Sequence, residues 1–587
     1  MQIYKTPVRD MMFCLEAHGF EDVQALSETY GFFDTETVAA LLEESGKFCT
    51  EQLLPLNRTG DNEGVQFDPE TGAVTTASGF PEVYKKYVAT GMAGIAKPEE
   101  HGGGGAPHVV GTFLNEMVTS TNKSFSMAPG LGHGLIESLI HYGTDQQKEV
   151  YLTRLISGEW TGTMCLTEPQ CGTDLGLIRT KAVPEGDSYK LTGTKIWITF
   201  GEHDFTDNII HLVLAKLPDA PPGIKGISAF IVPKINEDGT KNGIECGGLE
   251  HKMGIHASPT CVMNLEDATG YLVGEPHKGM RTMFVMMNSA RLGVGLEGVS
   301  LTEIAYQTAV EYAKDRRQSR SLSPEKRDAN ASADCILVHP DVRRMLANIR
   351  STNEALRGLA TWIANLYDVG HHHADEAVRQ EANDLVALLT PVMKSYGTER
   401  GCQNVSDAMQ VCGGSGFTTD WSIEQYYRDL RIAMIYEGTN HIQALDLVGR
   451  KLPMGGGRLM MAFAKRAKAL IGEASQNPAL APYAMDLGKA LGDLDEVTRT
   501  MMGKAAEEPE IIGAVASNYL NLFALSTLGY IWLKQLTTIG DREGRFYDLK
   551  RKSAHYYFKM VLPERHAYAA LVAEGNESIK QFAPDDF

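Results

Sequence analysis

The sequence predicts an α-helical protein with a central β domain, and three observations support this fold class. Residues 34–159 and 285–450 carry apolar side chains at helical intervals. Residues 160–284 instead contain short runs rich in Thr, Val and Ile, separated by Gly, Pro, Asn and Asp. The chain of 587 residues is also too long for one hydrophobic core, since a domain usually takes about 150 residues. We therefore expect several domains in the order α, β, α.

The first part of the chain is predicted to form an extension, 1–33, and an α domain, 34–159. Four apolar residues of the extension are expected to pack on the body of the protein: Met11, Met12, Phe13 and Leu15. Asp34 or Thr35 can cap a helix, which a Gly-, Asn- and Asp-rich loop near 57–64 is expected to interrupt. The glycines at 102–105 favour a connector over a phosphate-binding loop, because no strand and helix flank them.

The middle domain, 160–284, is predicted to contain strands at 161–166, 178–183, 189–199, 209–215, 227–232 and 262–265. Strands of this length and spacing are typical of a small barrel or sandwich. A C-terminal α-bundle domain, 285–450, follows, with helices expected at 291–314, 342–366, 375–393 and 403–411. The histidines at 371–373 fall between two of them, where a solvated loop is favoured over a metal site because adjacent histidines converge poorly on one ion.

An additional C-terminal helical domain is predicted at 458–587, after a Gly-rich linker, with helices around 460–471, 515–536 and 555–573. Its segment Lys550-Arg-Lys552 stands close to three aromatic residues at 556–558. A solvated helix face is the favoured interpretation of this segment, and a lipid-binding surface is the alternative.

Composition limits the classes of partner. The net charge of −19 and the pI near 5.4 argue against nucleic acid, because a phosphate backbone attracts basic proteins. Nine scattered cysteines without a CxxC pair favour reduced thiols over disulfides or a zinc site. No run approaches eighteen apolar residues, and residues 1–10 do not resemble a targeting segment. We therefore expect a cytoplasmic protein without a membrane span.

Glu437 is the acidic residue with the most informative surroundings. It follows the apolar run 432–436 and precedes a Gly-Thr-Asn turn, after which a periodic helix begins. A carboxylate at such a place can complement the helix dipole. It can also act as a general base held against an apolar pocket. The residues around Glu437 alone leave both roles open.

Five blocks of sequence resemble the acyl-CoA dehydrogenase family, in the family's order. The segment Tyr436-Glu-Gly-Thr439 resembles its catalytic turn, and Leu166-Thr-Glu-Pro-Gln-Cys-Gly-Thr-Asp174 resembles its flavin-binding signature. The other three blocks are Lys195-Ile-Trp-Ile-Thr199, Asp315-Arg-Arg-Gln-Ser319 and Ala408-Met-Gln-Val-Cys-Gly-Gly-Ser-Gly-Phe417. The start of the chain, at 4–15, is similar to the larger bacterial branch that includes enzymes for 3-methylmercaptopropionyl-CoA.

The resemblance implies that FAD is the cofactor, bound between two chains of at least a homodimer. Trp197 would stack near the flavin and Thr199 would hydrogen-bond it, since both are expected on one face of a strand. The absence of a GxGxxG motif between a strand and a helix agrees with a flavin rather than a nicotinamide cofactor. The implied cofactor-binding residues are Met164, Leu166, Thr167, Thr173, Trp197, Thr199, Arg316, Gln318, Gln410, Gly413, Gly414, Thr439 and His441.

The resemblance also makes Glu437 the catalytic base. Some relatives carry the base on another helix, immediately before an Arg, but here Ala290 precedes Arg291 and cannot serve. The implied substrate-binding residues are Thr173, Arg291, Glu437 and Gly438. Three positions depart from the usual pattern: Thr173 replaces Ser, Ser319 replaces Phe and His441 replaces Gln.

The predicted function is FAD-dependent α,β-dehydrogenation of an acyl-CoA, with electrons passed to electron-transfer flavoprotein. Within the family, the branch implies 3-methylmercaptopropionyl-CoA as the substrate, and hence a role in dimethylsulfoniopropionate catabolism. The alternatives are a short- or medium-chain fatty acyl-CoA dehydrogenase and an acyl-CoA oxidase. An alternative of another class is a flavin-containing relative that binds nucleic acid, against which the net charge argues.

Overall fold

The structure is a computed structural model that describes residues 2–587, with residues 286 and 288 described by backbone alone. The chain divides into two compact units. Unit 1 comprises residues 1–40, 107–112 and 294–587, and unit 2 comprises residues 41–106 and 113–293. The prediction of a largely helical protein around a β domain is confirmed. Each unit is described below by itself.

Unit 2 begins as helices and continues as a sheet. Its helical part consists of the end of α4 (Thr35–Phe48), α5 (Leu54–Glu63), α6 (Phe80–Ala89), most of α7 (His108–Thr121), α8 (Lys123–Tyr142), α9 (Asp145–Gln147) and α10 (Thr153–Ser157). The expected loop near 57–64 is wrong, because residues 57–63 belong to α5 and only Gly64 lies beyond its end. Gly60 lies inside that helix for a packing reason, since a Cβ there would lie 2.7 Å from the Phe80 ring.

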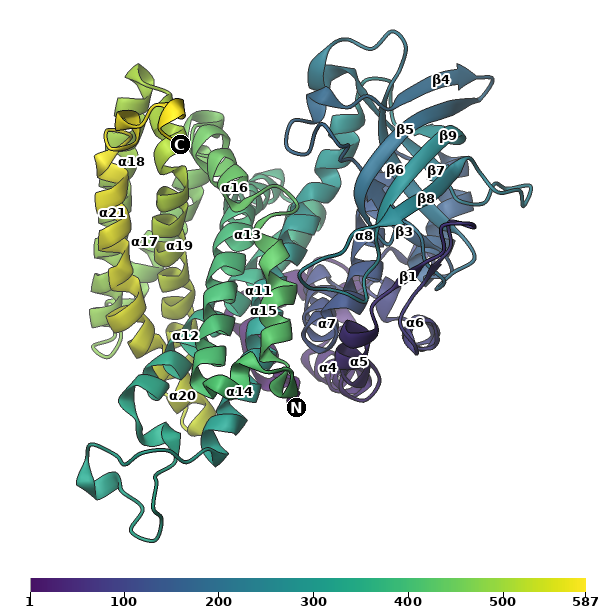
Figure 1. Ribbon diagram of the computed structural model, residues 1–587. Helices are drawn as coiled ribbons and strands as arrows, with labels where there is room; N and C mark the ends of the chain where they lie inside the picture. Colours follow the sequence, from purple (N-terminus) through teal and green to yellow (C-terminus); the bar gives the residue numbers. More distant parts are fainter. Residues whose placement is uncertain (1) are drawn as a thin grey trace. The chain divides into compact units, whose positions relative to one another are not determined.

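The sheet of unit 2 has seven strands, all but one of them predicted: β3 (Thr161–Cys165), β4 (Lys181–Glu185), β5 (Ser188–Thr199), β6 (Ile209–Lys216), β7 (Ile227–Pro233), β8 (Ile244–Leu249) and β9 (Thr260–Val273). The strand missed was β8. The order β3-β6-β4-β5-β9-β7 closes on itself, because β7 also pairs with β6. This ring of strands agrees with the predicted barrel (Figure 1). A separate two-stranded sheet pairs β1 (Gln66–Phe67) with β2 (Val74–Thr75).

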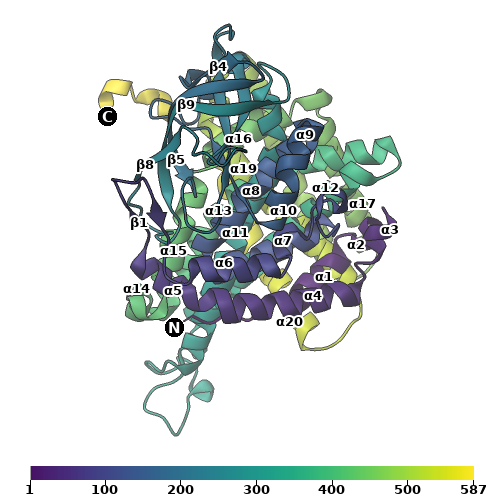
Figure 2. The same ribbon diagram turned by 90° about the vertical axis from the view of Figure 1, so that its right-hand side faces the viewer.

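Unit 1 is a bundle of long helices. Its central members are the C-terminal part of α11 (Gly279–Asp315), α12 (Pro340–His372) and α13 (Glu376–Cys412), followed by α14 (Gly414–Phe417), α15 (Ile423–Arg431) and α16 (Asn440–Asp446). The two helices predicted at 375–393 and 403–411 are one helix, α13. The loop between α11 and α12 extends away from the helices of this bundle in both views (Figures 1 and 2).

The C-terminal part of unit 1 adds five helices, α17 (Arg458–Ala474), α18 (Ala481–Glu507), α19 (Glu510–Ile539), α20 (Arg545–Tyr556) and α21 (Arg565–Glu574). Sequence periodicity missed α18 and all but the last two residues of α20. Helix α19 is long and apolar enough to cross a membrane, but 72% of its most apolar window is buried. It packs against α18, α21, α16 and α13, as the central helix of a globular bundle does.

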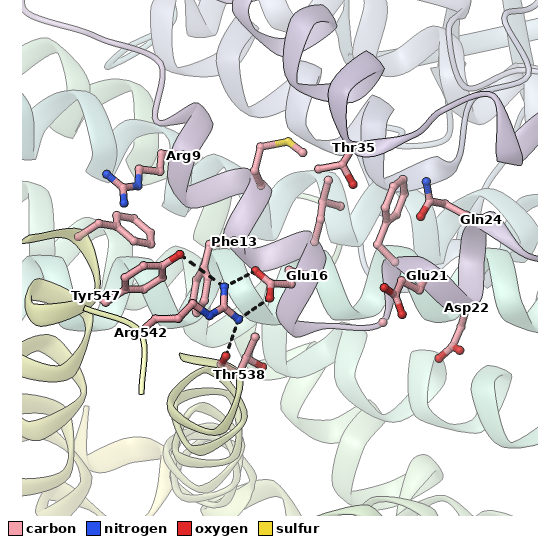
Figure 3. A pocket seen from close by; sticks show the side chains of 15 residues that line it. Arg9, Phe13, Glu16, Glu21, Asp22, Gln24, Thr35, Thr538, Arg542 and Tyr547 are labelled. Carbon is pink, nitrogen blue, oxygen red and sulfur yellow. Dashed lines mark hydrogen bonds and ion pairs between the residues drawn. The ribbon is translucent and has the colours of Figure 1, made fainter. Parts of the chain in front are cut away.

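The N-terminal extension forms α1 (Val8–Ala17), α2 (Phe20–Gln24) and α3 (Glu28–Gly31). Met11, Phe13 and Leu15 are buried as predicted, while Met12 is only partly buried. A cleft of about 740 Å³ lies between these helices and residues 538–547, which span the end of α19 and the start of α20. Figure 3 shows the side chains that line it. Beside it, Arg542 pairs with Glu16, and the Arg9 guanidinium lies 4.4 Å from the Phe546 ring centroid. The N-terminal helices therefore pack against the end of α19 and the start of α20 within unit 1.

A buried group of charges joins these same parts. Lys550 of α20 is fully buried and pairs with Asp10 of α1 and with Glu354 of α12. Arg357 pairs with Asp10 at 2.6 Å and with Glu303 at 2.8 Å. The interpretation of 550–558 as a solvated or lipid-facing surface is therefore wrong for Lys550, and also for the aromatic residues at 557 and 558, which are buried.

Candidate functional site

Glu437 stands at a chain reversal directly before a helix, as the sequence predicts. Thr439 caps α16, and its hydroxyl accepts a hydrogen bond from the Ile442 N–H at 3.3 Å. Both Glu437 and Gly438 have left-handed backbone conformations, with φ of +56° and +80°. A side chain at such a φ strains the backbone, so Glu437 occupies a position where glycine would be favoured. Strain of this kind gathers at functional sites.

A second carboxylate lies beside this turn. The hydroxyl of Tyr436 donates to the two oxygens of Glu297, at 2.6 and 2.5 Å. Glu297 belongs to α11 and its side chain is buried. Burial, together with Glu297 and Glu437, raises the pKa of Tyr436 well above its usual range, so the phenol stays a donor. Sequence reasoning did not identify Glu297, because its distance from Glu437 along the chain gave no signal.

In unit 2, Glu168 organises the residues of the predicted flavin-binding signature. Its carboxylate accepts a hydrogen bond from the buried Lys195 ammonium at 2.8 Å. It also accepts two bonds from Thr180, one from the Arg179 N–H and one from Gln170. Although burial by itself would raise it, the pKa of Glu168 is lowered to about 2, chiefly by Lys195. Both residues stand inside quoted sequence blocks, yet sequence reasoning gave neither a role.

The Glu168–Lys195 pair brings the two blocks of unit 2 together. The Lys195 ammonium also donates to the Leu166 carbonyl at 3.0 Å, and the Ile196 N–H donates to the Thr167 carbonyl at 2.9 Å. Gly172 also lies close to Thr167, since a Cβ there would be 3.8 Å from the Thr167 methyl group. The predicted residues at 164–167 and 195–199 therefore lie side by side.

Trp197 and Thr199 lie at the end of β5, where the strand is irregular. The pairing register with β9 shifts between Lys195 and Ile198, and Trp197 has a φ of +60°. A bulge therefore interrupts the strand here. Burial still alternates beyond it, because Trp197 is exposed, Ile198 is buried and Thr199 is partly exposed. The indole of Trp197 is 60% exposed, which is a large apolar surface to leave in water.

The predicted cofactor residues of unit 1 form two separate groups. Arg316 and Gln318 follow α11, while Gln410, Gly413 and Gly414 lie where α13 ends. These two ends meet, because Tyr312 of α11 contacts the α14 region through Ser415 and the Trp421 ring. Thr439 and His441 instead lie beside Lys394 of α13, through the neighbouring Gly438 and Asn440. Lys394 and Gln410 are about 24 Å apart along the helix axis, at the usual 1.5 Å rise per residue.

These residues fit a flavin dinucleotide. A Cβ at Gly413 or Gly414 would meet nothing within 4 Å, although the φ of +55° at Gly413, where α13 ends, by itself favours glycine. Open backbone there allows a ligand to approach closely. Arg316, Gln318 and Gln410 are exposed, and the Arg316 guanidinium is suited to a diphosphate. The exposed indole of Trp197 offers a planar surface to an aromatic ring.

The remaining predicted residues lie in α11 and in the loop after β3, and two positions that depart from the family pattern lie after α11 and in α16. Ala290 and Arg291 belong to α11, and both are partly buried. Thr173 is exposed. Ser319, which replaces the usual Phe, has a φ of +59° in the loop after α11. His441 bonds Ser517 of α19 at 3.0 Å. Among residues 2–587, no group of three His, Cys, Asp or Glu side chains is arranged to hold a metal ion.

Comparison with known proteins identifies the family. Three domain models, the acyl-CoA dehydrogenase N-terminal, middle and C-terminal domains, match residues 35–159, 163–268 and 277–452. A fourth, acetyl-CoA dehydrogenase C-terminal like, matches residues 459–583. The chain is 41% identical to a 3-methylmercaptopropionyl-CoA dehydrogenase of Ruegeria pomeroyi, over 98% of this chain and 99% of that protein. It is 32% identical to a butyryl-CoA dehydrogenase of Syntrophomonas wolfei, over 95% of each.

Solved structures share the fold. ACDH-11 of Caenorhabditis elegans, in complex with C11-CoA, has a TM-score of 0.80 at 19% identity, covering 95% of this chain and 91% of its own. An acyl-CoA dehydrogenase of Bacillus anthracis, complexed with FAD, has a TM-score of 0.74 at 24% identity, covering 94% and 90%. The chain therefore belongs to the acyl-CoA dehydrogenases, a family of FAD-dependent oxidoreductases that act on CH–CH bonds.

Proposed function

We propose that Glu437 is the base that removes the α-proton of an acyl-CoA. The observation that carries this proposal is the strained turn, in which a glutamate takes a left-handed conformation at the start of α16. A packing or capping role would not require this conformation, because Thr439 already caps the helix. The carboxylate would take the proton, and the Glu437 backbone N–H would donate to the thioester carbonyl as negative charge develops there. Bound FAD would supply the hydride acceptor for the β-carbon.

The residues that would hold the cofactor are those carried over from the family. Met164, Leu166, Thr167, Thr173, Trp197 and Thr199 would contact the flavin ring, and Arg316, Gln318, Gln410, Gly413, Gly414, Thr439 and His441 the diphosphate and adenosine. Thr173, Arg291 and Gly438 would contact the substrate together with Glu437.

The distance along α13 favours a homodimer. Diphosphate and adenosine are adjacent parts of one FAD. Thr439, however, lies beside Lys394 of α13, and Gln410 is about 24 Å from Lys394 along the axis of that helix. Two chains, each supplying one group, would resolve this separation. Sedimentation of the FAD-bound protein tests the proposal, and a monomer with full FAD content would contradict it.

The proposed substrate is 3-methylmercaptopropionyl-CoA, and the proposed acceptor is electron-transfer flavoprotein. The Ruegeria relative of that name matches 98% of this chain at 41% identity, whereas the butyryl-CoA relative reaches 32%. We also propose a cytoplasmic location, because the nine cysteines are free thiols and the cytosol keeps thiols reduced. We also propose five domains, with boundaries taken from the changes between helical and strand patterns in the sequence: 1–33, 34–159, 160–284, 285–450 and 458–587.

Substrate choice is tested with purified enzyme and a dye acceptor. We expect a higher kcat/KM for the thioether than for butyryl- or octanoyl-CoA, and the opposite order would refute the substrate assignment. The base is tested with Glu437→Gln, which should retain FAD but lose bleaching of the flavin by substrate. Glu473→Gln, at an exposed position of α17, is the matched control and should bleach normally.

A further inference from the structure

The strained turn at Glu437 needs contacts that hold it in place. A residue other than glycine in the left-handed region costs on the order of 1–3 kcal/mol, which the surroundings must offset. The carbonyl of Glu437 accepts a hydrogen bond from the Gln443 amide at 3.0 Å. The carbonyl of Gly438 accepts one from the Lys394 ammonium at 2.7 Å. Two neighbouring carbonyls of the turn are thus fixed by side chains from different helices.

Lys394 is a fully buried residue of α13. Its ammonium also donates to the Asn440 side-chain oxygen at 3.0 Å. Asn440 in turn donates from its amide nitrogen to the Ser395 carbonyl at 3.1 Å and to the Thr398 hydroxyl at 3.2 Å. One turn of α13 therefore holds both the residue after Glu437 and the first residue of α16.

A lysine is an expensive choice for these contacts. Removing an ammonium from water costs several kcal/mol, and a methionine of similar length would fill the same space. The helix does not explain the choice either, because a positive charge beside the first residue of α16 opposes the helix dipole. What lysine adds is a strong, directional donor to the Gly438 carbonyl.

We propose that Lys394 is a positioning residue for the reaction, which fixes the backbone of the 437–440 turn so that the Glu437 carboxylate meets the α-carbon. This inference rests on the proposed role of Glu437 as the base. Loss of the Lys394 bonds would leave the Gly438 carbonyl with only the longer bond from the Gln443 amide, at 3.4 Å, and let the turn relax. A displacement of about 1 Å in a reacting group can lower a rate about 100-fold.

The test separates proton removal from hydride transfer. Acetyl-CoA has α-hydrogens but no β-carbon in its acyl group, so the base can exchange its protons while no hydride is transferred. The FAD-bound enzyme is incubated with acetyl-CoA in D₂O, and deuterium uptake is measured by mass spectrometry. We expect exchange with the wild type and none above background with Glu437→Gln.

Lys394→Met should slow this exchange about 10- to 100-fold, while the KM for the acyl-CoA that the enzyme dehydrogenates stays within about threefold of the wild-type value. Lys394→Arg, which keeps a charged donor, should recover part of the rate. Lys465→Met, at an exposed position of α17, is the control and should exchange like the wild type. Asn440→Ala, which removes one partner of Lys394, provides a second test if Lys394→Met does not fold, and should slow exchange severalfold.

Wild-type exchange by FAD-bound Lys394→Met, or by Asn440→Ala where Lys394→Met does not fold, would overturn the proposal. Exchange by Glu437→Gln at the wild-type rate would instead overturn the base assignment. The two failures are therefore distinguishable.

Discussion

Replacing Lys550 with methionine is expected to destabilise unit 1 by about 3 kcal/mol. The Lys550 ammonium is fully buried between Asp10 and Glu354, and it lies 5.4 Å from the Trp532 ring centroid. Burial alone would lower the pKa of Lys550, but the two carboxylates raise it, so the side chain stays charged at neutral pH.

The magnitude follows from the charges that remain. The group contains the cations Lys550, Arg357 and Arg350 and the anions Asp10, Glu354 and Glu303. Removing one partner from a buried pair typically costs about 3–5 kcal/mol. In Lys550→Met, Asp10 keeps Arg357 at 2.6 Å and Glu354 keeps Arg350 at 2.7 Å, so we expect the lower end of this range.

A double-mutant cycle tests the balance of charge. Lys550→Met leaves one uncompensated anion and Asp10→Asn one uncompensated cation, whereas the double variant leaves two charges of each sign. We therefore expect the double variant to be at least about 1 kcal/mol more stable than the sum of the single changes implies.

The assay is urea unfolding followed by tryptophan fluorescence, to which the fully buried Trp532 contributes. Lys552→Met is the matched control, because residue 552 is exposed on the same helix and should change stability by no more than about 0.5 kcal/mol. Equal stability of Lys550→Met and Lys552→Met would refute the reasoning.

Three further outcomes are expected. Gly438→Ala should lower kcat more than about tenfold, because its Cβ would lie 2.9 Å from the Gln443 amide at a φ of +80°. The control is Gly449→Ala, where a Cβ meets nothing within 4 Å. Equal kcat values for the two variants would contradict the prediction. Lys195→Met should leave Glu168 buried without its cation and release FAD, measured as the flavin absorbance retained after gel filtration; Lys190→Met should retain the cofactor. Burial lowers the pKa of His18, His203 and His211 to about 3, so the unfolded chain binds more protons below pH 6.5 and stability is lost as the pH falls toward 3. Asp368, whose pKa burial raises to about 7, acts in the opposite sense and offsets one of the three histidines, so we expect the unfolding free energy still to fall as the pH is lowered from 6.5 to 5. Unfolding free energies that stay constant over this range would contradict this account.

Sequence reasoning succeeded where local pattern determines structure. The Thr- and Ile-containing run at 189–199 located β5, and the Gly-Thr-Asn turn located the start of α16. The pattern failed at Gly60, because the reason for that glycine is the Phe80 ring, which is distant in sequence. The strand β8 was also missed, because its two consecutive glycines, at 247 and 248, are not typical of a strand.

The candidate site shows the same division. Motifs pointed to Glu437, Thr167 and Trp197 as candidates, because each stands in a short block of adjacent residues, and their roles stay predictions. Glu297, Lys394 and the Glu168–Lys195 pair were missed as functional contacts, because each acts through a partner that folding brings near. Buried charges of this kind have no periodic signature, and only the three-dimensional arrangement distinguishes them from solvated ones.

The contact between Asp10 and Lys550 also constrains how the protein is made. Asp10 has two cationic partners, Arg357 and Lys550, and the second is synthesised 540 positions after it, which at 5–20 residues per second means a delay of roughly half a minute to two minutes. During that time α1 cannot bury its acid with both counterions in place, so we expect Met11, Phe13 and Leu15 to stay accessible to chaperones on the ribosome. The first helix of the nascent chain is thus among the last to reach its final place.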